Sequence, residues 1–326
     1  MKNILYIIVI AGLLTACKQD TPFPPGLDAN LRFKKITSYV LDTISQDTVI
    51  RMVSTATYDT KGKVKNVRMY QNNSEIRSID FEYPSGNHLT FNVTPKNYNW
   101  LALNGGVIYN EDDQVTEIYD RYKGEFNIVN TLERVFTYQN GKLKSTHIPH
   151  GDAPESYGWS GYNYFEFAGN KLMQFRNAST INDSTISRFS LGFGTLWRNI
   201  NFQYFPNDFN SNKLGVNLDE YYDYETFDGV ANGLDFYNLP YQNLFGLTGL
   251  FQLLPFLPKC NFLGVEPDAL ISEKIVTGYR ADNPNIPLYY KCQYSYEMDG
   301  QNRVIKKEQK TMSGQLLRVW YYEYEG

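Results

Sequence analysis

The chain has 326 residues, 31 Lys and Arg against 35 Asp and Glu, a formal net charge of −4 and 42% hydrophobic residues. This composition is typical of a folded globular unit and excludes a largely disordered chain. The basic residues are scattered, so the sequence offers no cationic stripe for nucleic acid, and we expect no nucleic acid partner. The 27 Tyr and 20 Phe favour strands, because aromatic side chains fit a half-buried pleated surface.

The first element is an export signal over residues 1–16. Lys2 supplies a positive start, and residues 4–14 form an apolar run that is too short to span a bilayer. The run ends in Leu-Thr-Ala-Cys at residues 14–17, which resembles the lipobox of bacterial lipoproteins. The resemblance implies cleavage before Cys17 and attachment of a diacylglycerol to its thiol. A membrane is then a partner through this anchor.

A proline-containing tether is expected to follow over residues 17–30. Pro22, Pro24 and Pro25 favour an extended, stiff segment that holds a domain away from a membrane. The remaining residues, 31–326, are predicted to form a single domain. The expected location is the outer membrane, with the periplasmic face and the cell surface both left open.

From about residue 55 a pattern of strand, polar turn and strand recurs. Aromatic and β-branched residues alternate, an Asp, Asn or Gly turn follows, and a Val or Leu opens the next strand. The clearest copies are residues 56–64, 135–143 and 294–304, with weaker ones at 81–89, 108–115 and 165–172. The aligned Val or Leu falls at positions 64, 89, 115, 143 and 172, in steps of 25, 26, 28 and 29 residues. Each step has room for two strands and two tight turns, so the sequence predicts repeated β-hairpins.

The repeated unit, Tyr-Asp/Asn-x-x-Gly-Lys/Arg-Val/Leu, resembles the tyrosine-aspartate (YD, Rhs-type) repeat. Together with the lipobox, the layout is similar to lipoproteins of polysaccharide-degrading Gram-negative commensals. The resemblance covers about residues 30–326. It implies an architecture and a compartment, and it brings no established activity.

The fold class expected from this repeat is mainly β. Two strands in each copy give more than about ten strands, and an open twisted sheet of that size tends to curl, close or split. We therefore predict an antiparallel meander of hairpins rolled into a barrel-like or two-layer sheet. Closure or packing would also hide the edge strands.

The repeat is interrupted between about residues 215 and 290. Residues 219–228 are acidic and aromatic, which suits a solvated loop or a site for glycan or calcium. In the apolar stretch 239–257, Leu247, Leu250, Phe251 and Leu254 share one helical face, so a short helix is predicted. This helix would plug or cap an open end of the β-structure, or contact a partner or membrane.

Four aromatic residues form the candidate ligand site: Tyr157, Trp159, Tyr162 and Tyr164. Aromatic faces beside polar side chains suit stacking on sugar rings. The same residues would also serve as packing in an ordinary strand. The period of two places Tyr157 and Trp159 on one face and Tyr162 and Tyr164 on the other, unless Gly161 marks a turn or bulge.

Two cysteines remain after the lipobox, Cys260 and Cys292. An exported chain can keep a disulfide between them, and a pair of buried thiols is the alternative. No Cys/His spacing suggests zinc, and His147 and His150 lie in one proline-containing loop with too few ligands around them. We therefore assign no metal site and no cofactor.

No catalytic residues are assigned, since the zinc-protease, nucleotide-loop and dinucleotide-binding motifs are all missing from the sequence. The expected function is a membrane-anchored, non-enzymatic module that binds a glycan or another envelope protein. The alternative is a periplasmic polysaccharide hydrolase, which needs only two suitably spaced carboxylates.

Overall fold

The computed structural model of the protein describes residues 31–42, 45–85, 87–95, 102–112, 114–123, 129–147, 162–178, 197–205, 216–217, 256, 269–279 and 287–326. Nearly all of these residues belong to sixteen strands. The strands are β1 (Phe33–Leu41), β2 (Thr48–Tyr58), β3 (Val64–Gln71), β4 (Ser74–Ser85), β5 (His88–Pro95), β6 (Ala102–Tyr109), β7 (Val115–Lys123), β8 (Val129–Gln139), β9 (Lys142–His147), β10 (Tyr162–Ala168), β11 (Lys171–Ala178), β12 (Trp197–Tyr204), β13 (Ile271–Tyr279), β14 (Pro287–Met298), β15 (Val304–Thr311) and β16 (Leu316–Tyr324).

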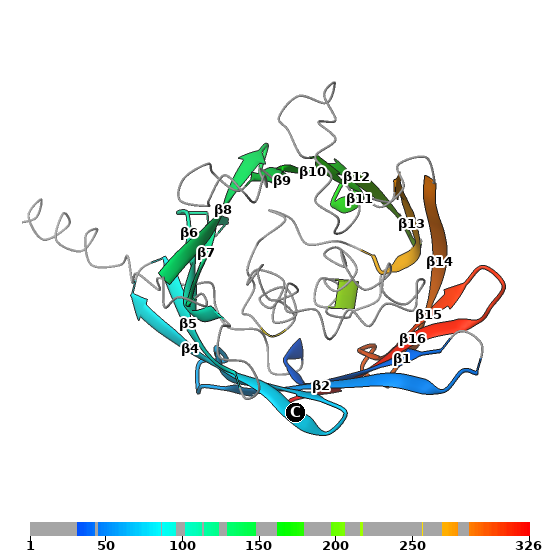
Figure 1. Cartoon of the computed structure of the whole chain (residues 1–326), viewed down its shortest axis with the longest axis horizontal. Helices are drawn as coiled ribbons and strands as arrows, with labels where there is room; N and C mark the ends of the chain where they lie inside the picture. The colour runs from blue at the N-terminus through cyan, green and yellow to red at the C-terminus, as the bar shows by residue number, and fades with distance from the viewer. Residues whose placement is uncertain are drawn as a thin grey trace, which may run out of the picture.

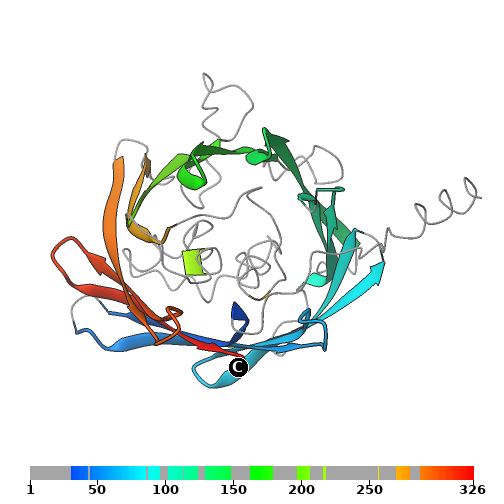
Figure 2. The ribbon, with the colours of Figure 1, turned by 180° about the vertical axis from the view of Figure 1, so that it is seen from behind.

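The strands form one closed antiparallel barrel in which each strand pairs with its neighbours in sequence (Figure 1). The barrel closes between the first and last strands, where Ile36 lies opposite Tyr322 and Ser38 opposite Trp320. The same ring is seen from behind in Figure 2. The predicted meander of hairpins is confirmed, and of the two arrangements expected it is the barrel.

The two rims of the barrel differ. One rim, here called the turn rim, carries the connections that follow the even-numbered strands, together with Phe33 at the start of β1 and Tyr324 at the end of β16. The opposite rim, the far rim, carries the connections that follow the odd-numbered strands. All the repeat turns recognised in the sequence lie on the turn rim.

The Asp of the repeat is explained by its turn. The Asp59 carboxylate accepts hydrogen bonds from the main-chain N–H groups of Lys61 (2.8 Å) and Lys63 (2.9 Å). Asp299 repeats this arrangement in the turn before β15. Gly62 adopts a left-handed φ of 77°, which glycine accepts at little cost. The Asp and Gly signals of the motif therefore encode local turn geometry.

The aligned Val and Leu residues form an apolar ring just inside the turn rim. Val64, Leu89, Val115 and Leu172 have no exposed surface, and Leu143 has 1%. Each is the first or second residue of an odd-numbered strand, so all of them lie near one end of the barrel. The repeat thus specifies one layer of the core.

Tyrosines near the ends of even-numbered strands donate hydrogen bonds to carbonyls at the start of the preceding odd-numbered strands, close to this ring. The Tyr83 hydroxyl donates to the carbonyl of Val64 (3.0 Å), and the Lys63 ammonium lies 4.9 Å from the centre of the same ring. Six such phenol-to-carbonyl bonds occur in the described barrel, donated by Tyr58, Tyr83, Tyr138, Tyr204, Tyr296 and Tyr324. The Tyr and the Lys or Arg of the motif therefore join successive repeats.

The β12–β13 connection contributes residues to the barrel interior. Val216 and Phe256 have no exposed surface, and the Phe256 ring meets Phe33 edge-on at 6.5 Å. Residues 216–217 are the short light-green piece inside the ring in Figures 1 and 2. These contacts agree with an interior plug. Apart from Phe256, the helix expected over residues 239–257 lies outside the described residues, as does the acidic segment 219–228.

The interruption of the repeat ends earlier than the sequence suggested. β13 begins at Ile271, inside the stretch 215–290 assigned to the interruption, and it pairs along its length with β12 and β14. Ile271 and Val276 are buried as in the other strands. The sequence pattern did not predict this strand, because the long connection before it lacks the Asp or Gly turn of the motif.

Candidate functional site

Several residues singled out in the sequence fall outside the part of the chain that the structure describes. They are Cys17 with its tether, Tyr157, Trp159, His150 and Cys260. Lipidation at Cys17 and ligand binding at Tyr157 and Trp159 therefore stay predictions.

Tyr162 and Tyr164 lie two residues apart on β10. Their register partners on β11 are Ala178 and Arg176. Phe165, the residue after Tyr164, is buried in the core. Tyr164 is half-buried, and the description of Tyr162 is limited to its backbone. The faces expected for these tyrosines and their role in ligand binding stay predictions.

Cys292 is buried on the inner face of β14. The Gln309 amide donates to its sulfur (3.3 Å) and to the Tyr294 hydroxyl (3.1 Å). Because Cys260 lies outside the described residues, a bridge between the two cysteines stays a prediction. The observed contacts are those of the alternative, a buried thiol held by polar neighbours.

A buried lysine is the most unusual group in the interior. Lys307 on β15 has no exposed surface, and its ammonium lies 3.9 Å from the centre of the Trp320 ring. The ammonium also donates to the carbonyl of Val216 (3.2 Å) in the β12–β13 connection. Buried charge is costly unless it is compensated, and here a ring face and a carbonyl compensate it. Lys307 thus fastens the interior segment to the wall.

Two further cations lie on this inner wall. Lys274 is buried at 3% exposure and lies opposite Cys292 in the β13–β14 register. The Arg318 guanidinium lies 5.2 Å from the Trp320 ring centre. Sequence reasoning missed these residues, although their inward positions in the strand alternation were a usable signal. Lys307 and Lys274 belong to the packed interior and Arg318 is half-buried beside it, so these cations explain core structure better than ligand binding.

The outer wall of the same strands carries paired charges. Along β15, Lys306 and Lys310 flank Glu308, with ammonium-to-carboxylate distances of 2.8 and 2.6 Å. Lys306 also meets Glu297 at 2.7 Å. The hydrogen bonds from Lys306 first, and then Lys310, lower the pKa of Glu308 to about 2. The carboxylate is therefore ionised at any ordinary pH.

The polar character of the wall continues around the barrel. On β3 and β4 the Asn66 amide donates to Asp80 (2.7 Å). On β5 and β7 the His88 ring nitrogen and the Tyr119 hydroxyl lie 2.8 Å apart, over Gly106 of the strand between them. At the closing seam Tyr39 and Tyr321 meet edge-on at 5.9 Å. The described wall is a mixed polar surface with scattered aromatic side chains.

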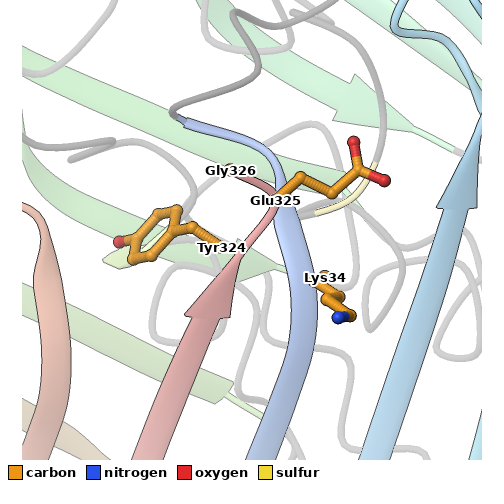
Figure 3. A pocket seen from close by; sticks show the side chains of 4 residues that line it. All are labelled: Lys34, Tyr324, Glu325 and Gly326. Atoms are coloured by element: carbon orange, nitrogen blue, oxygen red, sulfur yellow. The ribbon is translucent and has the colours of Figure 1, made fainter.

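A cavity of about 390 Å³ lies at the C-terminus on the turn rim, lined by Lys34, Tyr324, Glu325 and Gly326. Figure 3 shows the Tyr324 ring and the Glu325 carboxylate pointing away from each other. Glu325 is already paired with Arg32 at 3.1 Å. The polar groups do not converge on one point, so this cavity does not have the geometry of a catalytic site.

Among the described residues, no three His, Cys, Asp or Glu side chains lie together as a metal site. The described part of the chain also contains no helix of the length and hydrophobicity needed to cross a membrane.

Comparison with known proteins finds similarity in structure alone. No protein-family model matches the chain, and no curated protein sequence matches it. Among solved structures, a porin-like protein from Bacteroides uniformis matches with a TM-score of 0.51 at 12% identity, covering 90% of this chain and 98% of that one. At this identity the match shows that the two chains share a fold.

Two other solved structures are less similar. A porin-like protein from Bacteroides vulgatus matches with a TM-score of 0.48 at 14% identity, covering 90% of this chain and 98% of that one. The TcdB2-TccC3 crystal structure matches with a TM-score of 0.23 at 7% identity, covering 86% of this chain and 16% of that one.

Proposed function

We propose that the chain is a lipid-anchored envelope protein whose barrel stands in water beside the membrane. In this role it is a non-enzymatic binding module for a glycan or another envelope protein. The proposal combines the lipobox-like sequence at residues 14–17 with the polarity of the barrel wall.

The observation that carries the proposal is the orientation of the side chains on the last strands. On β15 the outward residues Lys306, Glu308 and Lys310 are charged, while on β16 the inward Trp320 is 2% exposed. A barrel that spans a membrane requires the opposite pattern, with an apolar band facing lipid and a polar interior. Outward charges at these positions would be costly in hydrocarbon. The wall therefore suits water.

The interior supports binding at the surface over transport through a channel. The apolar ring of the repeat is fully buried, and Val216 and Phe256 pack inside the barrel against its wall. A water-filled channel requires a polar, solvated lumen. An interior with buried apolar side chains of this kind leaves the outer wall and rims for recognition.

The polysaccharide hydrolase remains without support from the comparisons. Among the described carboxylates, Asp59 and Asp299 hold turns and Glu308 is held between two lysines. These arrangements are structural, and they favour the binding module.

Partitioning of an anchorless protein tests the proposal. The native lipoprotein is compared with a chain in which an ordinary secretory leader replaces residues 1–17. We expect the native protein in the detergent phase and the anchorless one, with the same β-type circular dichroism, in the aqueous phase. An anchorless barrel that still needs detergent would contradict a water-facing wall.

Protease treatment of intact and lysed cells locates the native lipoprotein. Digestion on intact cells indicates the cell surface and favours glycan capture. Protection until lysis indicates the periplasmic face and favours an envelope protein as partner.

A further inference from the structure

The closing seam of the barrel, where β1 meets β16, carries a group of outward-facing tyrosines (Figure 1). Tyr321 on β16 is 44% exposed, and its ring meets the half-buried Tyr39 of β1 edge-on at 5.9 Å. On β3, the half-buried Tyr70 lies opposite Val53 of β2. We call these three tyrosines, with the wall between them, the seam surface. Tyrosine is enriched at protein interfaces because its large ring carries a hydroxyl.

The wall between the tyrosines is closed. Trp320 and Met69, the chain neighbours of Tyr321 and Tyr70, belong to the buried core, so strand alternation places these tyrosines on the outer face. The smaller outward residues between them are only 6%, 8% and 6% exposed, which means that neighbouring side chains close over them: Thr37, Val53 and Val319. Small molecules bind in concave sites. A closed wall with exposed rings therefore fits a protein partner better than a small ligand.

Charged residues stand in registered rows on both sides of the seam. Lys35 of β1 lies opposite Glu323 of β16, with 2.5 Å between ammonium and carboxylate and with 33% and 54% of the side chains exposed. Nearer the far rim, Glu308 of β15 and Arg51 of β2 end one row of four outward residues across β15, β16, β1 and β2. Each of these two rows has its acid on the β16 side of the seam and its base on the β1 side.

This arrangement is self-complementary. A twofold axis parallel to the strands, between β1 and β16, brings each residue opposite the one at the same height across the seam. Lys35 of each copy then faces Glu323 of the other, and the acidic end of the farther row faces its basic end. In the row between them, Lys306 faces the uncharged Val53. An interface between two identical copies requires this match of opposite charges.

The same axis suits two anchored copies. The chain reaches the barrel at Arg32, whose carbonyl accepts a hydrogen bond from the Glu325 N–H (2.9 Å) on the turn rim. Rotation about an axis parallel to the strands keeps both turn rims on the same side, whereas an axis across the strands turns one of them over. The two expected tethers, over residues 17–30, extend at most about 50 Å each. They can therefore reach one bilayer only in the first arrangement.

From these observations we propose that two copies of the chain associate through the seam surface, with Lys35 and Glu323 paired reciprocally across the twofold axis. The inference goes beyond the proposed function and rests on it in one respect, because it takes the outer wall to face water. Two anchored barrels held side by side present two binding surfaces to one polymeric ligand, which raises the overall affinity without new contacts.

Sedimentation velocity of the anchorless barrel tests the proposal. We expect its mass to rise from one chain to two between about 1 and about 200 µM, because a contact confined to this part of the wall belongs to the smaller interfaces. Tyr321→Ala removes the most exposed ring of the seam surface and is expected to weaken association about tenfold. Lys35→Glu and Glu323→Lys each bring like charges together at the axis, so each alone is expected to weaken association by about tenfold or more.

An equimolar mixture of the two charge variants is the deciding measurement. Lys35→Glu presents two acids at the axis and Glu323→Lys presents two bases, so a mixed pair has opposite charges at both positions. We expect the mixture to form the dimer that neither variant forms alone, a rescue that an ion pair within one chain cannot produce. Lys291→Glu is the matched control, because it breaks the Lys291–Glu273 pair (2.8 Å) on β13 and β14, away from the seam. It is expected to associate as the native barrel does.

Three results would overturn the proposal: a barrel that stays monomeric over this range, charge variants that associate as the native barrel does, or a mixture that stays monomeric. The first would leave the wall to another envelope protein or a glycan. The partitioning experiment reads the solubility of the same anchorless barrel separately. A barrel that needs detergent contradicts the proposed function, whereas a water-soluble monomer contradicts the association alone.

Discussion

The Tyr324 hydroxyl at the end of β16 donates a hydrogen bond of 2.9 Å to the main-chain carbonyl of Val304 at the start of the neighbouring strand β15. The Arg303 guanidinium lies 4.7 Å from the centre of the same ring. Val304 has no exposed surface, so its carbonyl cannot replace this bond with water at no cost. Tyr324 thus contacts both the Arg and the Val of the preceding repeat, so these contacts explain the Tyr, Lys/Arg and Val/Leu positions of the motif.

Tyr324→Phe removes this bond and keeps the ring. We expect the free energy of unfolding to fall by about 1 kcal/mol, because a buried carbonyl loses its donor. Urea unfolding followed by circular dichroism measures the change. Tyr289→Phe, at an exposed position, is the control and is expected to unfold as the native protein does. Equal stability of the two variants would show that the bond contributes little.

Trp320→Ala and Tyr321→Ala compare the two faces of β16. Trp320 is 2% exposed inside the barrel and Tyr321 is 44% exposed outside it. We expect the tryptophan substitution to cost about 3–5 kcal/mol and the tyrosine substitution about 1 kcal/mol or less. Denaturant midpoints of the anchorless barrel give both values. The reverse order would mean that the inner and outer faces are exchanged.

Gly106→Ala tests the contact between His88 and Tyr119 on the outer wall. An added Cβ would lie 2.6 Å from the Tyr119 hydroxyl and 2.8 Å from the His88 ring nitrogen, so both side chains must shift. A loss of about 1–3 kcal/mol in unfolding free energy is expected. At Gly300 an added Cβ meets nothing within 4 Å, so Gly300→Ala serves as the control. A similar loss for both variants would contradict this account.

The lowered pKa of Glu308 predicts that the stability of the barrel depends on pH. Its pKa is lowered to about 2 in the folded barrel, where Lys306 and Lys310 favour the ionised form. Its contribution is therefore complete above the unfolded pKa of about 4.5 and is lost as the pH falls from there toward 2. We expect Glu308→Gln to cost about 1 kcal/mol at pH 7 and to lose less stability than the native protein between pH 5 and pH 2.

Thermal unfolding of both proteins across this pH range measures the difference. Glu323→Gln, at a carboxylate whose side chain is 54% exposed, is a control expected to follow the native curve more closely. Parallel pH curves for native protein and Glu308→Gln would exclude a stabilising role for this ionised carboxylate.

We expect folding to protect the Cys292 thiol from thiol reagents. Its side chain is buried and hydrogen-bonded to Gln309, so in a Cys260→Ser background we expect labelling by a thiol reagent only on unfolding. In the native sequence, the same assay distinguishes a free Cys292 thiol from a disulfide to Cys260. Reactive Cys292 after unfolding without reductant supports the free thiol, and labelling that requires reductant supports the bridge to Cys260.

Much of the barrel was foreseeable because its signals are local. The repeat steps from Val64 to Leu172 predicted hairpins of the observed size, and each aligned residue is buried at the turn rim. Turn residues such as Asp59 and Gly62 act within a few residues of themselves. The candidate ligand site was harder, since amino-acid alternation shows which residues share a face and leaves open what covers that face.

The mainly β class, the hairpin unit, the repeat spacing and the turn geometry can all be predicted from the sequence, because alternation and turn chemistry depend on neighbouring residues. Three features appear first in the folded barrel: β1 closes on β16, Val216 and Phe256 lie inside, and Lys307 faces inward while Lys306 faces out. Those features depend on contacts between residues far apart in the chain. Closure of the sheet makes one face an interior, and that interior then selects which side chains are buried.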